Sequence, residues 1–411
     1  MKAQVVEQVT VAQAKTAIAQ TAALYFAKDA NGRYRIDRRR ARPVCLMGPA
    51  GIGKTEVVRQ VAEEQGLAFL SYSVTHHTRQ SAIGLPRLSE CEVDGRTVPI
   101  TEYTMSEIIA EVYRVMRESG KKEGILFLDE FNCASETLRP IMLQLLQSKT
   151  FGPHAIPEGW MLVLAGNPSE YNVSARALDA VTADRLRMLW LQPDYNAWRA
   201  YMVSRGVHPV VLSYLDDHRR QFYVFEKGKD GEALVTARGW EDLSVMLRMM
   251  EEFGYPVDLP FVAQYIQSAQ VAREFISYYH QYSTIIASGL ADAVFTNSLT
   301  EKQEKKLSEM SFPQKWALTA VVLTRLEQIC ADAKRGKADA AIWNVLHFYD
   351  AFFDGAPQQE FLLGGITNTD AIALYIAEHG SDAYGAFAEK VFFSDAKAPS
   401  VKKLKALLDA G

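Results

Sequence analysis

The residues with the clearest chemical signature lie in the stretch GPAGIGKT, which follows the apolar run PVCLM (43–47). The stretch matches the pattern G-x-x-x-x-G-K-[ST]. Glycines let backbone N–H groups turn inward around phosphate oxygens, and a helix that begins at the lysine adds the positive end of its dipole. We therefore predict a phosphate-binding loop made of Gly48, Pro49, Ala50, Gly51, Ile52, Gly53, Lys54 and Thr55. Lys54 would reach the β- and γ-phosphates of a nucleotide, and Thr55 would bind Mg²⁺.

Two further apolar runs end in side chains suited to hydrolysis. ILFLDE (125–130) ends in Asp129, which would help to hold Mg²⁺, and Glu130, which would polarise the attacking water as a general base. LVLAGNP (162–168) ends near Asn167, whose carboxamide could orient that water. Taken singly, such acids can be solubility caps and an Asn-Pro pair can simply form a turn. Together with the phosphate loop, they favour hydrolysis.

Short apolar runs alternate with helical patterns around these residues. This alternation predicts a parallel sheet covered by helices on both faces. The expected strands are 43–47, 67–74, 124–130, 160–168 and 186–191, and the expected helices are 1–30, 54–66, 105–119, 134–148 and 175–185. Asp94-Gly95, between two short extended runs, predicts that a β-hairpin projects from residues 83–104. After Pro193 the pattern becomes mostly helical, with an exposed turn expected at 226–232.

The overall composition describes an ordinary multidomain protein. The chain has 411 residues, 48% of them hydrophobic, and a formal net charge of −4, which gives no general attraction to nucleic acid or anionic membranes. The four cysteines form no CxxC pair and no Cys/His cluster with metal spacing, which fits a reducing cytosol, so we expect a cytoplasmic protein. The sequence contains no run of about 18 apolar residues, so we expect no membrane span.

The motifs together resemble those of the AAA+ ATPases. The phosphate loop, the strand that ends in Asp-Glu, the strand that ends in Asn and a later helix with Asp-Arg follow the pattern of that superfamily. The hairpin and the stretches DEFNCA, LAGNP and VTARGWEDL are most similar to its MoxR branch, chaperone-like ATPases that work with partners of the von Willebrand factor A (VWA) type. The resemblance covers about residues 40–255. Cys133 departs from it, since a basic residue is more usual there.

The resemblance assigns roles to individual residues. Lys54 and Thr55 correspond to the Walker A residues, Asp129 and Glu130 to the Walker B pair, and Asn167 to sensor 1. It also implies that Arg185, in TADRL, is an arginine finger that reaches the γ-phosphate of a neighbouring subunit. Arg238, in TARGW, corresponds to sensor 2 on a lid over the nucleotide.

The same resemblance implies a domain order and partners. The expected parts are an N-terminal helix and basic linker (1–40), an AAA+ α/β core (41–193), a helical lid (194–282) and a helical C-terminal region of unknown role (283–411). ATP and Mg²⁺ are the expected cofactors. The resemblance implies a homo-oligomeric ring of six subunits, which would remodel a protein client such as a VWA-domain protein.

The stretch RYRIDRRRARP (33–43) holds six arginines just before the first strand of the expected core. These arginines could bind nucleic acid, face a neighbouring subunit or form an ordinary solvated surface. The first option leads to an alternative function, a nucleic-acid-associated motor or loader, including an ATPase of a defence system. Salt-dependent DNA binding would distinguish that function from client remodelling.

Overall fold

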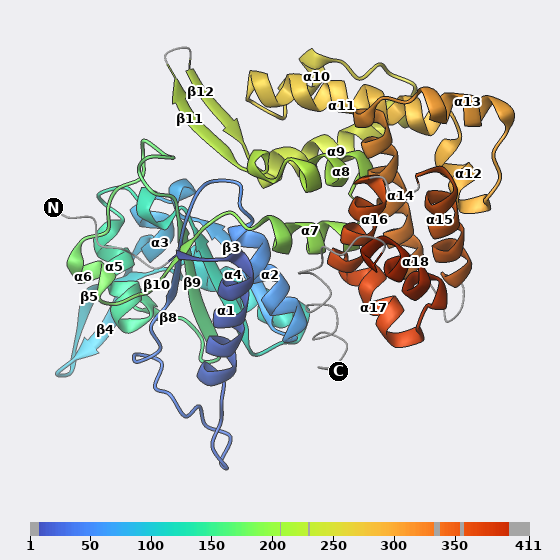
Figure 1. The fold of residues 1–411 in the computed structure, drawn as a ribbon. Helices are drawn as coiled ribbons and strands as arrows, with labels where there is room; N and C mark the ends of the chain where they lie inside the picture. Colours follow the sequence, from blue (N-terminus) through green and yellow to red (C-terminus); the bar gives the residue numbers. More distant parts are fainter. Residues whose placement is uncertain (1–7, 206, 229–230, 333–337, 354–356, 394–411) are drawn as a thin grey trace. The chain divides into compact units, whose positions relative to one another are not determined.

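The computed structural model describes residues 8–205, 207–228, 231–332, 338–353 and 357–393. By their contacts these residues form two compact units, both drawn in Figure 1. The first unit extends to Tyr201 and also includes Thr236–Arg238, and the second holds Met202–Val235 and the chain from Gly239 onward. No helix of the described residues is long and apolar enough to cross a membrane.

A six-stranded parallel sheet forms the centre of the first unit (Figure 1). The strands are β1 (Gln8–Val9), β2 (Val44–Met47), β3 (Ala68–Ser73), β6 (Gly124–Asp129), β9 (Trp160–Gly166) and β10 (Arg187–Leu191). Their order across the sheet is β1-β10-β2-β9-β6-β3. β2 and β9 are buried along their whole length, as expected for strands covered on both faces. Because all neighbours are parallel, the residues that follow β2, β6 and β9 meet at one edge.

Helices cover both faces of this sheet. On one face, Leu126 and Leu128 of β6 share a buried cluster with Ile109 and Leu145 of the covering helices α4 and α5. On the other face, α2 packs against β6 and β9, and α1 packs against α2. The helices of this unit are α1 (Val11–Tyr25), α2 (Lys54–Glu64), α3 (Arg79–Ile83), α4 (Glu107–Ser119), α5 (Arg139–Ser148) and α6 (Ala180–Ala183), with 3₁₀ turns η1 (Val74–His76) and η2 (Phe131–Cys133). The boundary between the two units falls within α7 (Tyr195–Ser204).

The predicted α/β architecture is confirmed, and so are all five predicted strands. The predicted hairpin is also present, as β4 (Pro86–Val93) paired antiparallel with β5 (Arg96–Tyr103). Its two turn residues, Asp94 and Gly95, have φ angles of 50° and 73°. Positive φ at both central positions defines the turn type that suits the twist of a tight hairpin, and it explains the Asp-Gly pair. A second small hairpin, β7 (Thr150–Phe151) with β8 (His154–Ala155), follows α5.

The N-terminal segment differs from the helix predicted over 1–30. The side chain of Thr10 accepts the backbone N–H of Gln13, and the side chain of Gln13 accepts the backbone N–H of Thr10. This capping box starts the helix at Val11. The two residues of β1 therefore remain extended and pair with β10 at the edge of the sheet. Residues 1–7 lie outside the described residues.

Two other predicted helices are shorter than expected. The helix predicted over 134–148 begins only at Arg139, where Pro140 occupies the first turn, a position that proline favours. The helix predicted over 175–185 is reduced to α6, because Asp179 caps the chain by accepting the N–H of Thr182.

The second unit is mostly helical, as predicted, but the turn expected at 226–232 is part of a β-hairpin. Its strands are β11 (Val224–Gly228) and β12 (Gly231–Val235). The rings of Tyr214, Trp240 and Phe275 pack together in the core. The helices are α8 (Pro209–Asp217), α9 (Ala237–Glu252), α10 (Leu259–Ala263), α11 (Ala269–Ala287), α12 (Leu290–Thr296), α13 (Glu301–Glu309), α14 (Phe312–Asp332), α15 (Asp339–Phe352), α16 (Pro357–Asn368), α17 (Asp370–His379) and α18 (Asp382–Phe393), with the 3₁₀ turn η3 (Arg219–Gln221). Residues 394–411 of the predicted C-terminal region lie outside the described residues.

Candidate nucleotide-binding site

The loop between β2 and α2 has the backbone conformation that its glycines allow. Gly51 and Gly53 have φ angles of 72° and 88°, and Gly53 is the N-cap of α2. A side chain at Gly51 would meet the side chain of Thr236, since an added Cβ would lie 2.8 Å from its Cβ atom. The loop therefore requires glycine at position 51 for conformation and for space.

Lys54 is buried at the start of α2, and only 8% of its surface is exposed. Its Nζ donates to the carbonyl oxygens of Gly48 at 3.0 Å and Pro49 at 2.7 Å, and to Oδ1 of Asn167 at 2.7 Å. Burial lowers the pKa of Lys54 to about 8; the nearby charge of Asp129 opposes that effect, and Arg238 adds to it. Among the described residues the ammonium group donates only to neutral oxygens, which suits it to bind an anion.

Thr55 and Asp129 meet where α2 begins and β6 ends. The Thr55 hydroxyl donates to Oδ2 of Asp129 at 3.2 Å, and Oδ1 of Asp129 accepts the backbone N–H of Glu130 at 2.9 Å. A hydroxyl and a carboxylate side by side are the oxygen ligands that Mg²⁺ prefers, together with phosphates and waters. The glycine-rich loop, the buried lysine and this oxygen pair fit a nucleotide with Mg²⁺.

The carboxylate of Glu130 is held by the neighbouring strand. Its Oε2 accepts the hydroxyl of Thr75 at 2.7 Å and that of Ser73 at 2.9 Å, and its backbone lies in the left-handed region at φ 55°. The Thr75 hydrogen bond lowers the pKa of Glu130, burial opposes this, and Ser73 and the charge of His76 lower it further. The two hydroxyls were not predicted from the sequence, although the run SYSVT places them at the end of a predicted strand, β3, which pairs with β6.

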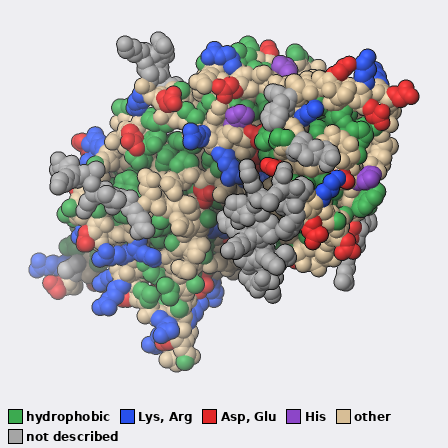
Figure 2. All heavy atoms as spheres, viewed as in Figure 1, with side chains coloured by type: hydrophobic (Ala, Val, Ile, Leu, Met, Phe, Trp, Pro, Cys, Tyr) green, Lys and Arg blue, Asp and Glu red, His purple; other side chains and the backbone are tan. Residues whose placement is uncertain are grey.

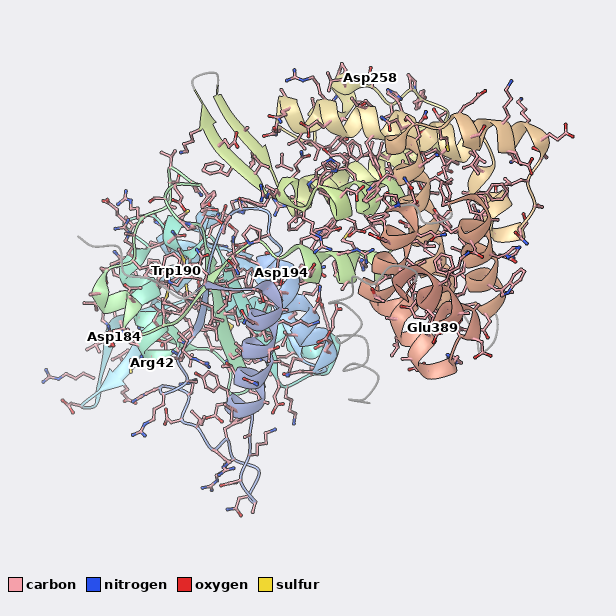
Figure 3. All side chains as sticks on the ribbon, viewed as in Figure 1. Arg42, Asp184, Trp190, Asp194, Asp258 and Glu389 are labelled. Carbon is pink, nitrogen blue, oxygen red and sulfur yellow. The ribbon has the colours of Figure 1, made fainter. Side chains whose placement is uncertain are left out.

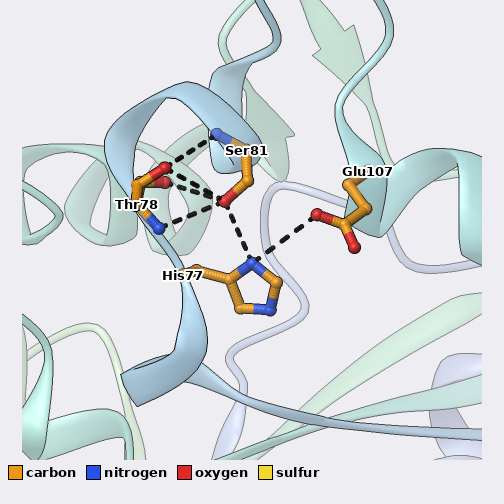
Figure 4. Close-up of polar contacts among 4 residues, drawn as sticks. All are labelled: His77, Thr78, Ser81 and Glu107. Atoms are coloured by element: carbon orange, nitrogen blue, oxygen red, sulfur yellow. Dashed lines mark hydrogen bonds and ion pairs between the residues drawn. The ribbon is translucent and has the colours of Figure 1, made fainter.

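His77 connects the segment that carries Thr75 to α3 and lies close to α4 (Figure 4). Nδ1 of His77 lies 3.1 Å from the Ser81 hydroxyl and 3.9 Å from the Glu107 carboxylate, and its ring stacks on Tyr72. Both polar neighbours face the same ring nitrogen. The cluster therefore lacks the relay of a serine nucleophile, in which the two ring nitrogens have different partners.

Asn132 joins the end of β9 to the turn after β6, and sequence reasoning gave it no role. Its Nδ2 donates to the carbonyl oxygens of Asn167 at 2.8 Å and Arg176 at 3.3 Å. It can approach so closely because Gly166 has no side chain; an added Cβ there would lie 2.4 Å from Oδ1 of Asn132. Asn132 thus fixes the backbone that presents Asn167. The next residue, Cys133, has a pKa raised mainly by burial, so it is a thiol.

The two predicted arginines have different surroundings. The backbone N–H of Arg238 donates to the Gly51 carbonyl at 3.3 Å, and its charge influences Lys54. Arg185 lies just after α6 and after Asp184 (Figure 3), and its guanidinium donates to the Val181 carbonyl. When the side-chain amide of Gln147 is oriented with its oxygen toward Arg185, this oxygen accepts two hydrogen bonds from the guanidinium, at 2.7 and 3.1 Å.

The structure therefore brings five of the predicted side chains to one edge of the sheet: Lys54, Thr55, Asp129, Glu130 and Asn167. Arg238 contacts the loop of this group, since its backbone N–H donates to the Gly51 carbonyl. Among the contacts of the described residues, Arg185 has none with this group.

Comparison with known proteins agrees with this geometry. Residues 44–148 match the family model described as "ATPase family associated with various cellular activities (AAA)". A stretch of 120 residues is 29% identical to the Lon protease of Fusobacterium nucleatum, and the alignment covers 28% of this chain and 14% of that protein. The sheet, the loop and the match together support membership of the AAA+ superfamily for this part of the chain.

Proposed function

We propose that the protein hydrolyses ATP with Mg²⁺ at the edge of the sheet described above. The observation that carries this proposal is that Lys54, Asn167 and the Thr55–Asp129 pair meet at the carboxyl ends of three parallel strands. Bound Mg²⁺ would supply positive charge to the phosphate oxygens. Lys54 binds phosphate, Glu130 takes a proton from the attacking water, and Asn167 orients that water.

The larger function that we propose is remodelling or activation of a partner protein by a MoxR-like ring, with six subunits as the expected number. Support comes from the sequence motifs and from Arg185, whose contacts lie outside the group around Lys54. In this proposal Arg185 completes the site of the next subunit, residues 194–282 act as the lid, and Arg238 senses the nucleotide. A VWA-domain protein is the proposed client.

Ring assembly tests this proposal. We expect the Glu130→Gln variant, which would hold ATP without consuming it, to form a ring of defined mass when MgATP is added. Light scattering after size exclusion, with and without nucleotide, measures the mass. Lys54→Ala serves as the control and should not respond to ATP. A monomer under both conditions would contradict the proposed mechanism.

The pKa of Lys54 predicts how nucleotide binding depends on pH. Since phosphate favours the charged ammonium form and the pKa of the free site is about 8, binding above that pH must take up a proton, and affinity should fall as pH rises. Calorimetry in two buffers with different ionisation enthalpies measures the uptake. Lys54→Arg should remove it, since arginine stays charged. Affinity that stays constant as the pH rises through 8 would argue against this role.

The hydroxyls that hold Glu130 predict an effect on the acid side of the rate profile. Their hydrogen bonds lower the pKa of Glu130, so the base stays ionised toward lower pH. Removing them in a Ser73→Ala/Thr75→Val variant should move the acid limb of the kcat profile to higher pH. Thr75→Ser keeps a donor and should leave the limb in place. An unchanged profile in the double variant would show that these contacts do not tune Glu130.

The alternative function, a nucleic-acid motor or loader, has one observation in its favour. Four arginines of the cluster at 33–43 line a cavity of the first unit, where they could meet phosphates. In this case DNA or RNA should stimulate ATP hydrolysis, and added salt should suppress the effect. ATPase activity that is indifferent to nucleic acid would remove this alternative.

A further inference from the structure

A cavity of about 790 Å³ lies in the first unit, away from the group around Lys54. Its wall is formed by the loop that follows α1, by Lys149 after α5, and by residues 158–162 around the beginning of β9. The group around Lys54 lies at the other end of the parallel strands, roughly 20 Å away along the length of β9. The volume is within the usual range for small-molecule sites.

The cavity wall is strongly basic. Five cationic side chains line it, against the two carboxylates of Asp37 and Glu158: Arg33, Arg35, Arg38, Arg39 and Lys149. Asp37 is occupied by its own loop, because Oδ1 accepts the Arg39 N–H at 2.7 Å. Within the described part of the chain, none of the five cations forms an ion pair with a carboxylate. Figure 2 shows Lys and Arg side chains gathered along the lower edge of this unit.

Lys149 is the most unusual of these cations. Only 5% of its surface is exposed, and its backbone has a φ of 58°, a conformation that usually selects glycine or asparagine after a helix. Its Nζ donates to the Leu146 carbonyl at 2.6 Å. Burial and the charge of Arg38 lower its pKa to about 8. Burying an ammonium group beside a guanidinium is unfavourable for folding, and a bound anion would offset that cost.

The loop that carries the arginines is held in a defined conformation by contacts within the protein. Oδ1 of Asp29 accepts the N–H groups of Asn31 at 2.8 Å and Arg33 at 2.9 Å. The guanidinium of Arg38 donates to the Ile156 carbonyl at 2.8 Å, which holds it against the segment that leads into β9. A preformed set of cations loses less entropy when a ligand binds.

We propose that this cavity binds the phosphate groups of a ligand, with Lys149 and Arg38 as their central contacts. Guanidinium groups offer paired donors that match two phosphate oxygens, and an ammonium group offers a point charge. The aromatic side chains of Tyr25, Phe26 and Trp160 also line the cavity and provide apolar surface for the rest of such a ligand. The two possible sources are a free phosphorylated molecule and the phosphates of a nucleic acid.

Calorimetry with inorganic tripolyphosphate tests the proposal. The full-length Lys54→Ala variant is the starting protein, since its phosphate loop no longer competes. We expect one site per chain, with proton uptake at pH values near 8, because the bound anion favours the charged form of Lys149. Lys149→Gln and Arg38→Gln should each weaken binding by about tenfold or more, as charge-assisted hydrogen bonds are lost. Lys149→Arg should retain binding without the proton uptake.

Arg117→Gln, which removes an exposed cation from α4, is the matched control and should bind like the starting protein. A single-stranded DNA of about ten nucleotides distinguishes the sources. If this DNA binds and tripolyphosphate does not, and the cavity variants weaken DNA binding by the same factor, the proposal is supported and the phosphates are assigned to nucleic acid. The proposal is overturned if neither probe binds, or if Arg38→Gln binds as well as Arg117→Gln. It is also overturned if the cavity variants change only the assembly of the chain, since the cations would then contact a second copy.

Discussion

Glu130→Gln should bind MgATP as tightly as the unchanged protein while its turnover falls by about 10² to 10⁴, the usual contribution of a general base. The amide has nearly the same shape as the carboxylate, and its oxygen can still accept a hydroxyl of Ser73 or Thr75. It cannot take a proton from water. Binding and hydrolysis should therefore separate in this variant.

Phosphate release at saturating ATP measures the turnover, and a fluorescent ATP analogue measures the binding. Glu136→Gln is a suitable control, since Glu136 is an exposed acid on the same stretch of chain whose partner is Arg176. It should hydrolyse ATP at a near-normal rate. Near-normal turnover by Glu130→Gln would exclude Glu130 as the base, and loss of ATP binding would point to a structural role instead.

The rate of ATP hydrolysis by Arg185→Ala should be lower by about 10³-fold or more, the usual effect of removing an arginine finger. In the proposed mechanism the arginine stabilises charge that develops on the transferred phosphoryl group, so the loss should appear mainly in kcat. Its own chain should still bind ATP, since the guanidinium contacts Val181 and Gln147 and not the group around Lys54.

Arg176→Ala is the matched control, because Arg176 belongs to the same stretch between β9 and β10 and pairs with the exposed Glu136. We expect its steady-state ATPase rate to stay near normal. A similar rate for Arg185→Ala would remove that residue from catalysis, and a loss of nucleotide affinity without a loss of kcat would give it a binding role.

The architecture around the site could be predicted from the sequence because its signals are local. β9 is a buried apolar run long enough to be recognised without any partner, and Asp94-Gly95 specifies a tight hairpin by its own conformational preference. β1 has only two residues, too few for a pattern, and it exists because β10 offers it an edge. The hairpin of β11 and β12 was missed because its Gly- and Lys-rich centre has the composition of a turn.

The candidate catalytic side chains were predicted by motif, whereas their supporting contacts depend on the tertiary fold. Thr75 meets Glu130 only because β3 pairs with β6, and Asn132 reaches the Asn167 backbone only across Gly166. Nothing in the run QSKTF indicates that Lys149 is buried or next to Arg38. Such contacts join residues far apart in the sequence, and local sequence patterns do not reveal them.

In the proposed mechanism two subunits share each nucleotide site, and mixing two inactive variants tests this sharing. Lys54→Ala cannot use its own phosphate loop but still has Arg185, and Arg185→Ala has an intact loop without the arginine. Mixed rings should therefore recover part of the ATPase activity, because some intact loops would then face an intact arginine. Phosphate release measured across a series of mixing ratios should pass through a maximum. Activity that never exceeds that of either variant alone, in rings confirmed to be mixed, would contradict a shared site.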